Sequence, residues 1–426
     1  MRLGLNDGGR VCIVGGGPAG SFAAIHLLNL MRQHDLKLKI TIFEPRDFSR
    51  PGPGGCNRCA GVLSSRLLSA LESVGLSLPE EVVQAKINSY AINLDGEVLN
   101  IHRPDPSRRI LSIYRGAGPR LTQGEVIASF DNFLLREACS RGAEHVNARV
   151  RVVSWEGKPV VYTAQGRHEA DLLVLATGVN SRAPLNEAFG YRPPKTAIMA
   201  QDEVLRPEDW QDDEVSTFLK EPPGLIFGAL IPKGRYLNIS LLGRDLATDA
   251  ISEFIEAQKL NLSIPFSSGG LCGCTPRIAI RPARGFYGDR WVAVGDAAVS
   301  RLYKDGIGSA FSTAEEAMKT AIEVGISRTS FRKSYAPFCK KISTDNTYGR
   351  ILFNAWSLTQ RIPLLLRGWS RAIQAEENLP AARRIHARTL WGMFTGDELY
   401  RDLLWRVLNP TSMITLLQSV FRVRRE

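Results

Sequence analysis

Four of the seven cysteines stand in two short pairs, and thiols at such spacing are typical of metal or redox chemistry. Cys56 and Cys59 form C-x-x-C in "PGPGGCNRCAGVLS", and Cys272 and Cys274 form C-x-C in "GGLCGCTPR". If the two loops meet, four thiolates are enough to hold zinc or an iron–sulfur cluster. Two alternatives stay open: a thiol pair that exchanges electrons with a cofactor, and small buried residues in glycine loops with no joint role.

A glycine turn near the N-terminus predicts a dinucleotide site. "GGGPAG" fits G-x-G-x-x-G and lies between a short apolar strand and a helix with apolar side chains at helical spacing. The first glycine allows a tight turn, the second lets the backbone approach a pyrophosphate, and the third allows the helix to pack on the strand. The helix N-terminus attracts phosphates, and an acid at the end of the next strand can bind ribose hydroxyls. The residues predicted to bind the dinucleotide are Gly15, Gly17, Pro18, Ala19, Gly20 and Glu44.

Two further strand ends carry polar or glycine residues. In "DLLVLATG" an apolar strand leads into Thr177 and Gly178, and in "WVAVGDAAVSRLYKDGIGSAF" a strand leads into Gly295 and Asp296. An aspartate there can accept hydrogen bonds from ribityl or ribose hydroxyls. A second glycine pair then opens a long helix, whose positive end suits an isoalloxazine ring that carries negative charge when reduced. This helix start consists of Gly306, Ile307 and Gly308.

The order of strands and helices predicts an α/β fold with interleaved domains. We expect a Rossmann-like FAD-binding domain, a mostly β substrate domain and a helical C-terminal region. The predicted bounds are 1–85, 108–180 and 276–330 for the first, 86–107 and 181–275 for the second, and 331–426 for the third.

Together the three motifs resemble the FAD-dependent oxidoreductases of the glutathione-reductase type, and within them the geranylgeranyl reductase family, which is related in fold to the aromatic hydroxylases. The resemblance spans residues 10 to about 330. It implies that Cys59, Ala60 and Gly61 of "CAGVLS" lie against the flavin. It also implies that Phe227 and Lys233 of "FGALIPKG" line the substrate pocket, where the family pattern is aromatic-x-Trp-x-Phe-Pro-Lys.

The chain departs from the family pattern at three places. Ala229 and Ile231 replace the Trp and the Phe of that pattern, which predicts a pocket of another shape. The stretch "GEVIA" before "SFDNFL" lacks an arginine that relatives carry there. Thr177 stands where related hydroxylases have an Asp-Gly pair tied to NADPH use. The electron donor is therefore expected to be NAD(P)H or a ferredoxin-like protein, and the last departure favours the protein donor.

The resemblance predicts an enzyme that reduces double bonds of a hydrophobic isoprenoid- or quinone-type substrate. In that hypothesis Cys59, Lys233 and Phe227 act at the reacting end of the pocket. One alternative is a flavin monooxygenase of a hydrophobic substrate. A second is an FAD and iron–sulfur electron-transfer protein, which would use Cys56, Cys59, Cys272 and Cys274 as metal ligands.

The charge of the chain favours anionic partners. The formal net charge is +11, and residues 350–426 hold twelve arginines, no lysine and six acids. Four of the seven tryptophans also lie in that segment, which fits either an interfacial membrane helix or a helical lid packed on the body. No nucleic-acid motif accompanies the charge. Because we find neither a signal peptide nor a membrane-spanning run, we expect the protein in the cytoplasm, with peripheral membrane binding as an open alternative.

Overall fold

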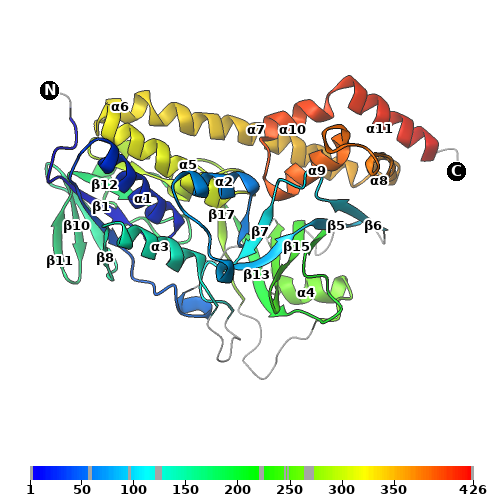
Figure 1. Ribbon diagram of the computed structural model, residues 1–426, viewed down its shortest axis with the longest axis horizontal. Helices are drawn as coiled ribbons and strands as arrows, with labels where there is room; N and C mark the ends of the chain where they lie inside the picture. The colour runs from blue at the N-terminus through cyan, green and yellow to red at the C-terminus, as the bar shows by residue number, and fades with distance from the viewer. Residues whose placement is uncertain are drawn as a thin grey trace.

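The computed structural model describes residues 3–55, 60–94, 97–119, 127–219, 225–243, 246, 249–262 and 273–423. Figure 1 shows two sheets side by side, with helices along one side of both. The α/β fold class predicted from the sequence is confirmed, including the helical C-terminal region.

The first sheet has six strands, with β1 (Arg10–Val14) between β2 (Lys39–Phe43) and β12 (Leu172–Leu175). Its five neighbouring strands from β19 to β8 run parallel, and only the edge strand β18 is antiparallel. The carboxyl ends of the parallel strands therefore share one edge, and the turns that follow them open into the same crevice. The remaining strands are β8 (Glu144–Val146), β18 (Tyr287–Gly288) and β19 (Trp291–Ala293).

Helices cover one face of this sheet. α1 (Pro18–Gln33) packs against both α3 (Phe130–Ser140) and α5 (Gly306–Lys319), and the rings of Phe22 and Phe311 meet edge to face at 5.1 Å. This helix is apolar on most of its circumference because it is buried between the sheet and its neighbours. The other face of the sheet is covered by a small antiparallel sheet. Its strands are β9 (Val152–Trp155), β10 (Pro159–Thr163) and β11 (Gly166–Glu169).

The second large sheet has seven strands in the order β17-β13-β16-β15-β14-β5-β6. One face packs against α4 (Ala250–Ala257), where the ring centres of Phe218 and Phe254 lie 5.1 Å apart. β17 pairs with β13 in this sheet, although the predicted domain bounds place its residues in the first domain. The strands are β5 (Ser89–Leu94), β6 (Glu97–His102), β13 (Thr196–Leu205), β14 (Glu214–Phe218), β15 (Leu225–Lys233), β16 (Tyr236–Gly243) and β17 (Arg277–Ala279).

A short three-stranded sheet is built from strands that lie between β2 and β8 along the chain, and α2 (Ser65–Ser73) follows its first strand. Its order is β3-β7-β4, and both pairs are antiparallel. The strands are β3 (Val62–Leu63), β4 (Val83–Ile87) and β7 (Ile110–Ile113).

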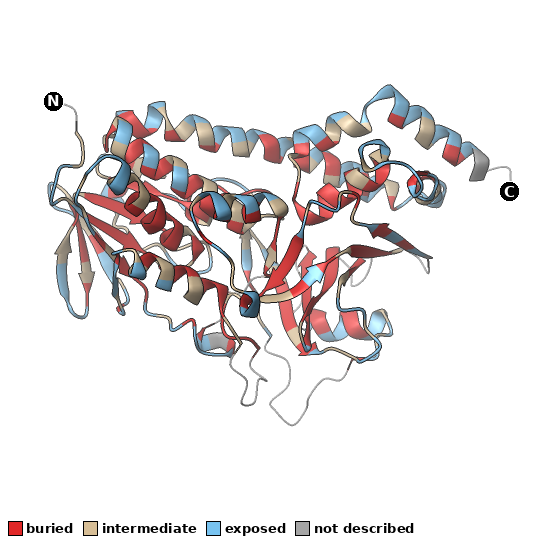
Figure 2. Cartoon of the chain, in the orientation of Figure 1, coloured by how far each residue is buried: buried red, intermediate tan, exposed pale blue. Residues whose placement is uncertain are grey.

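The C-terminal helices are packed on the body through most of their tryptophans. Trp356, Trp369 and Trp391 are buried, whereas Trp405 is 62% exposed. Figure 2 shows that the outer side of the last helix is largely exposed. Interfacial membrane binding by this end stays a prediction; within the described residues, no helix is long and apolar enough to cross a bilayer. The helices are α6 (Arg328–Lys333), α7 (Tyr335–Thr359), α8 (Pro363–Glu376), α9 (Ile385–Thr395), α10 (Tyr400–Val407) and α11 (Pro410–Val423).

The loop that leads into α5 is held by these C-terminal helices. The buried amide of Asn346 on α7 accepts a hydrogen bond from the Leu302 amide at 2.8 Å and donates one to the Ser300 carbonyl at 2.8 Å. Arg301 donates to the carbonyls of Gly396 and Glu398, which follow α9. The position of the α5 N-terminus therefore depends on residues almost one hundred positions further along the chain.

We expect Asn346→Ala to lower the free energy of unfolding by about 2–6 kcal/mol, because two buried backbone groups lose their partner at about 1–3 kcal/mol each. Urea titration followed by circular dichroism measures this change. Thr347→Ala is the matched control, since Thr347 is exposed on the next position of the same helix. Equal stability of the two variants would contradict the role given to Asn346.

Candidate functional site

A cavity of about 1150 Å³ lies between the carboxyl edge of the first sheet and one face of the second. Its walls come from the turns after β1, β2, β12 and β19, from the α5 N-terminus, from strands β13 to β16, and from α9. Sites for one small molecule usually measure about 300–1,000 Å³. The cavity therefore has room for a large ligand or for two ligands side by side.

The glycine turn after β1 forms one end of the cavity. Gly15 has a φ of +106°, and a Cβ there would lie 2.5 Å from the carbonyl oxygen of Ala176. A Cβ on Gly20 would lie 1.8 Å from the carbonyl oxygen of Gly15. Only glycine fits both positions, as the motif predicts. Gly17 caps α1, and the first turn of the helix holds no acid, so this turn carries no negative charge that would oppose an anion at the positive helix end.

Glu44 stands where the sequence predicts it, directly after β2 in the cavity wall. Its buried carboxylate accepts hydrogen bonds from the Gly16 amide at 2.9 Å and from the Arg46 amide and Nε at 3.0 and 3.2 Å. These donors fix the carboxylate at the strand end, where hydroxyl groups of a ligand can reach it.

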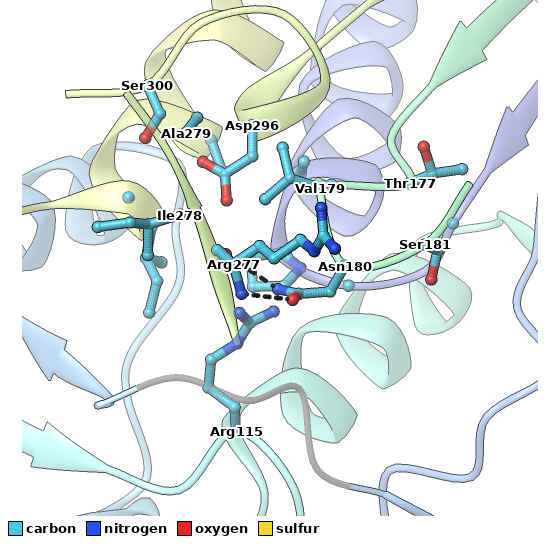
Figure 3. A pocket seen from close by; sticks show the side chains of 18 of the residues that line it. Arg115, Thr177, Val179, Asn180, Ser181, Arg277, Ile278, Ala279, Asp296 and Ser300 are labelled. Carbon is cyan, nitrogen blue, oxygen red and sulfur yellow. Dashed lines mark hydrogen bonds between the residues drawn. The ribbon is translucent and has the colours of Figure 1, made fainter. Parts of the chain in front are cut away.

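Thr177 and Asp296 place oxygen atoms at the next two strand ends. The Thr177 hydroxyl is buried and has no hydrogen-bond partner in the described part of the chain. Burial raises the pKa of the Asp296 carboxyl, while a hydrogen bond from Ser300 and the charge of Arg115 oppose the rise. Figure 3 shows the Arg115 and Asp296 side chains directed into the same space from separate elements. A ligand with several hydroxyl groups would satisfy these oxygens.

Arg115 corrects one expectation from the sequence. We expected no arginine near the Phe-Asp pair that opens α3, because "GEVIA" holds none. In the structure Arg115 lines the cavity and binds both carboxylate oxygens of Asp131 at 2.9 and 2.8 Å. The two residues are 16 positions apart, so a search just before the pair misses the arginine. Its position directly after the apolar strand β7 is the sequence signal that could have revealed it.

The flavin-facing loop predicted by the resemblance is described only in part. Ala60 and Gly61 line the cavity, and Gly61 has a φ of +69°. A Cβ there would lie 2.1 Å from the Ile113 carbonyl oxygen, so this position requires glycine. Cys59 lies outside the described residues.

The remaining predicted cofactor residues gather at the same edge. Gly178, Gly306 and Ile307 line the cavity together with the residues above. Gly295 and Gly308 lie directly behind them: a Cβ on Gly295 would meet the Cβ of Ala19 at 2.8 Å, and a Cβ on Gly308 would meet the Asp305 carboxylate at 2.3 Å.

The predicted substrate residues divide into two groups. Phe227, Ala229 and Ile231 line the cavity from β15, so both positions that depart from the family pattern face the ligand space. Lys233 is only 1% exposed and is not among the residues that line it. Its Nζ lies 3.5 Å from the Glu203 carboxylate and 4.6 Å from the centre of the Tyr114 ring, behind the cavity wall.

The predicted metal centre receives no support. Cys56, Cys59 and Cys272 lie outside the described residues. Cys274 lies beside the second sheet, where its carbonyl accepts a hydrogen bond from the Gln201 amide at 2.9 Å. In the part of the chain that the structure describes, no three His, Cys, Asp or Glu side chains could share a metal ion.

Comparison with known proteins gives likeness in structure alone. No protein-family model and no curated protein sequence matches the chain. A geranylgeranyl bacteriochlorophyll reductase-like protein from Thermoplasma acidophilum matches with a TM-score of 0.64 and 15% identity, over 95% of this chain and 99% of its own.

Two further structures extend the likeness. The peptidyl tryptophan dihydroxylase QhpG matches with a TM-score of 0.51 and 21% identity, over 81% of this chain and 74% of its own. A variant of HpxO from Klebsiella pneumoniae, solved with FAD, matches with a TM-score of 0.53 and 16% identity, over 83% of this chain and 94% of its own. The fold expected from the sequence resemblance is thus confirmed.

We expect Arg115→Ala to lower the free energy of unfolding by about 3–5 kcal/mol, because the fully buried Asp131 then loses its bidentate partner. The double variant Arg115→Ala with Asp131→Asn should recover a large part of the loss, since the uncompensated charge is gone. Chemical denaturation of the three proteins measures both steps. A double variant no more stable than the single one would show that the charge of Asp131 is not what Arg115 compensates.

Proposed function

We propose that this chain is an FAD-dependent oxidoreductase. The observation that carries the proposal is that one cavity joins a glycine turn of dinucleotide type to apolar side chains of the second sheet. A dinucleotide at one end and a hydrophobic substrate at the other would share this space. The structural likeness to a protein solved with FAD supports the same cofactor.

The described residues fit FAD at its polar parts. Glu44 is placed for ribose hydroxyls, the N-terminus of α1 for the pyrophosphate, and Asp296 for the ribityl chain. The glycine-built walls at Gly61 and at the start of α5 leave room for a flat ring. When bound, FAD would supply hydride or electron transfer.

The residues of the chain would bind and orient the substrate and keep water away from it. The wall of the second sheet includes the apolar side chains of Phe227, Ala229 and Ile231, with the polar Gln201, Thr217 and Ser240 on the neighbouring strands. The small and aliphatic side chains of Ala229 and Ile231 widen the space for a branched or ring-shaped apolar molecule. We therefore keep an isoprenoid- or quinone-type substrate whose double bond is reduced, with NAD(P)H or a ferredoxin-like protein as electron donor.

The purified protein is expected to carry FAD, seen as the visible absorption bands of oxidised flavin. Glu44→Ala should weaken FAD binding about 10–100-fold, because hydrogen bonds to a charged group contribute about 1.5–3 kcal/mol. Flavin fluorescence during titration of the apoprotein measures the affinity. Glu144→Ala is the control, since Glu144 lies on the neighbouring strand β8 and is exposed. Absence of flavin binding in the unchanged protein would refute the proposed function.

A flavin monooxygenase is the second candidate, and the structural likeness to a peptidyl tryptophan dihydroxylase favours it. Anaerobic incubation of dithionite-reduced protein with geranylgeraniol separates the two. A reductase should give a product that has gained two hydrogen atoms, detected by mass spectrometry, with free FAD as control. A product that has gained oxygen, and forms only in air, would replace the reductase by the monooxygenase.

A further inference from the structure

Lys304 places a positive charge in the cavity without an anion beside it. The residue lies in the loop before α5 and lines the cavity. Its Nζ lies 4.1 Å from the centre of the Phe227 ring on β15. Within the described residues, the Nζ takes part in no hydrogen bond and no ion pair, so its contact among them is with the Phe227 ring.

The acids nearest to Lys304 along the loop and across it are bound to other groups. Asp305 accepts a hydrogen bond from the Ser64 hydroxyl at 3.1 Å and lies 3.8 Å from the Arg301 guanidinium. A Cβ on Gly396, in the loop after α9, would lie 2.8 Å from the Lys304 Cβ, so that loop packs against the lysine stem.

Asp397, in the loop after α9, is also bound to other groups. Asp397 accepts hydrogen bonds from the Ser65 amide at 3.0 Å and from Arg108 at 3.2 Å, and its side chain is fully buried. The other titratable side chains that line the cavity near this loop are Tyr90, Asp296, Arg301 and Tyr303. Burial, rather than one of these neighbours, is the cause of the lowered pKa of Lys304.

The surroundings of the ammonium group are aromatic. Tyr90 and Phe394 stack at 6.1 Å in the same wall, and Phe227 completes it. Burial in this environment lowers the pKa of Lys304 to about 8, so the group is still mostly protonated at neutral pH. The attraction of a cation to an aromatic ring is weaker than the cost of removing an ammonium from water without a counter-charge.

We infer that Lys304 binds a carboxylate carried by an otherwise apolar substrate. The inference rests on the proposed function, because it assigns this half of the cavity to the substrate. Contact with β15 supports the assignment: the Nζ is directed to the second sheet, whereas the dinucleotide-type turn lies at the edge of the first. The aromatic wall would hold the apolar part of such a molecule, and the ammonium would fix its acidic end.

The test compares octanoate with octanol, which share a chain and differ in charge. Titration calorimetry is carried out on the holoprotein and on Lys304→Met and Lys304→Arg, well below and well above pH 8. The unchanged protein should prefer octanoate at least tenfold below the lysine pKa and lose this preference as the pH rises through about 8, because the ammonium deprotonates. Lys304→Met should show no preference, and Lys304→Arg should keep it at both pH values, since arginine stays charged.

Lys341→Met is the control, because Lys341 is exposed on α7, and it should behave as the unchanged protein. Equal binding of octanoate and octanol by the unchanged protein overturns the inference, as does a preference that survives in Lys304→Met. A flavin potential that shifts in Lys304→Met while octanoate binding stays constant also overturns it, since Lys304 would then pair with the cofactor. A protein without flavin contradicts the proposed function alone, and the heat of octanoate binding still decides the role of Lys304.

Discussion

The geometry of the cavity depends on one buried side-chain amide. Asn346 satisfies a backbone N–H and a backbone C=O of the loop that leads into α5, and both of these groups belong to buried residues. The same loop carries Lys304 and the left-handed Asp305, whose φ is 56°. Strain of this kind persists only where the surroundings fix the backbone. The C-terminal helices are therefore part of the site, although none of their residues belongs to a cofactor motif.

A second constraint is the close contact of backbone with backbone at the strand ends. At Gly15, Gly20 and Gly61 a single methyl group would overlap a carbonyl oxygen. This packing brings α1 tightly onto the first sheet and leaves the ends of its strands open to the cavity. Buried polar groups there are costly without a hydrogen-bond partner, and the Thr177 hydroxyl has none among the residues that the structure describes. A ligand that binds them would add to the stability of the fold.

The parts of the site that could be predicted from the sequence are those in which the functional residue and the strand that positions it lie in one short segment. The glycine turn, Glu44 and Asp296 each end a strand, so local pattern is enough to place them. Arg115 was missed because its partner Asp131 lies 16 positions further along the chain. Lys233 fits the family pattern, and its alternation with Phe227 along β15 predicts that both side chains point to the same side of the strand. In the structure, however, Lys233 lies behind the cavity wall, where it forms an ion pair with Glu203. The residue pattern of one strand cannot show which side chains of the neighbouring strands lie beside its end.

The chain leaves the first sheet and returns to it late. β12 pairs with β19, where Leu173 aligns with Trp291, and the hydrogen bond from Ser65 to Asp397 joins residues 332 positions apart. Contacts of such long range form slowly, and synthesis delivers the N-terminal part first. During translation the glycine turn therefore emerges long before β19, the fifth parallel strand of its sheet, has been made. The site can then bind a cofactor only after nearly four hundred residues have left the ribosome. Until that point, the exposed apolar edge of the incomplete sheet would be a target for chaperones.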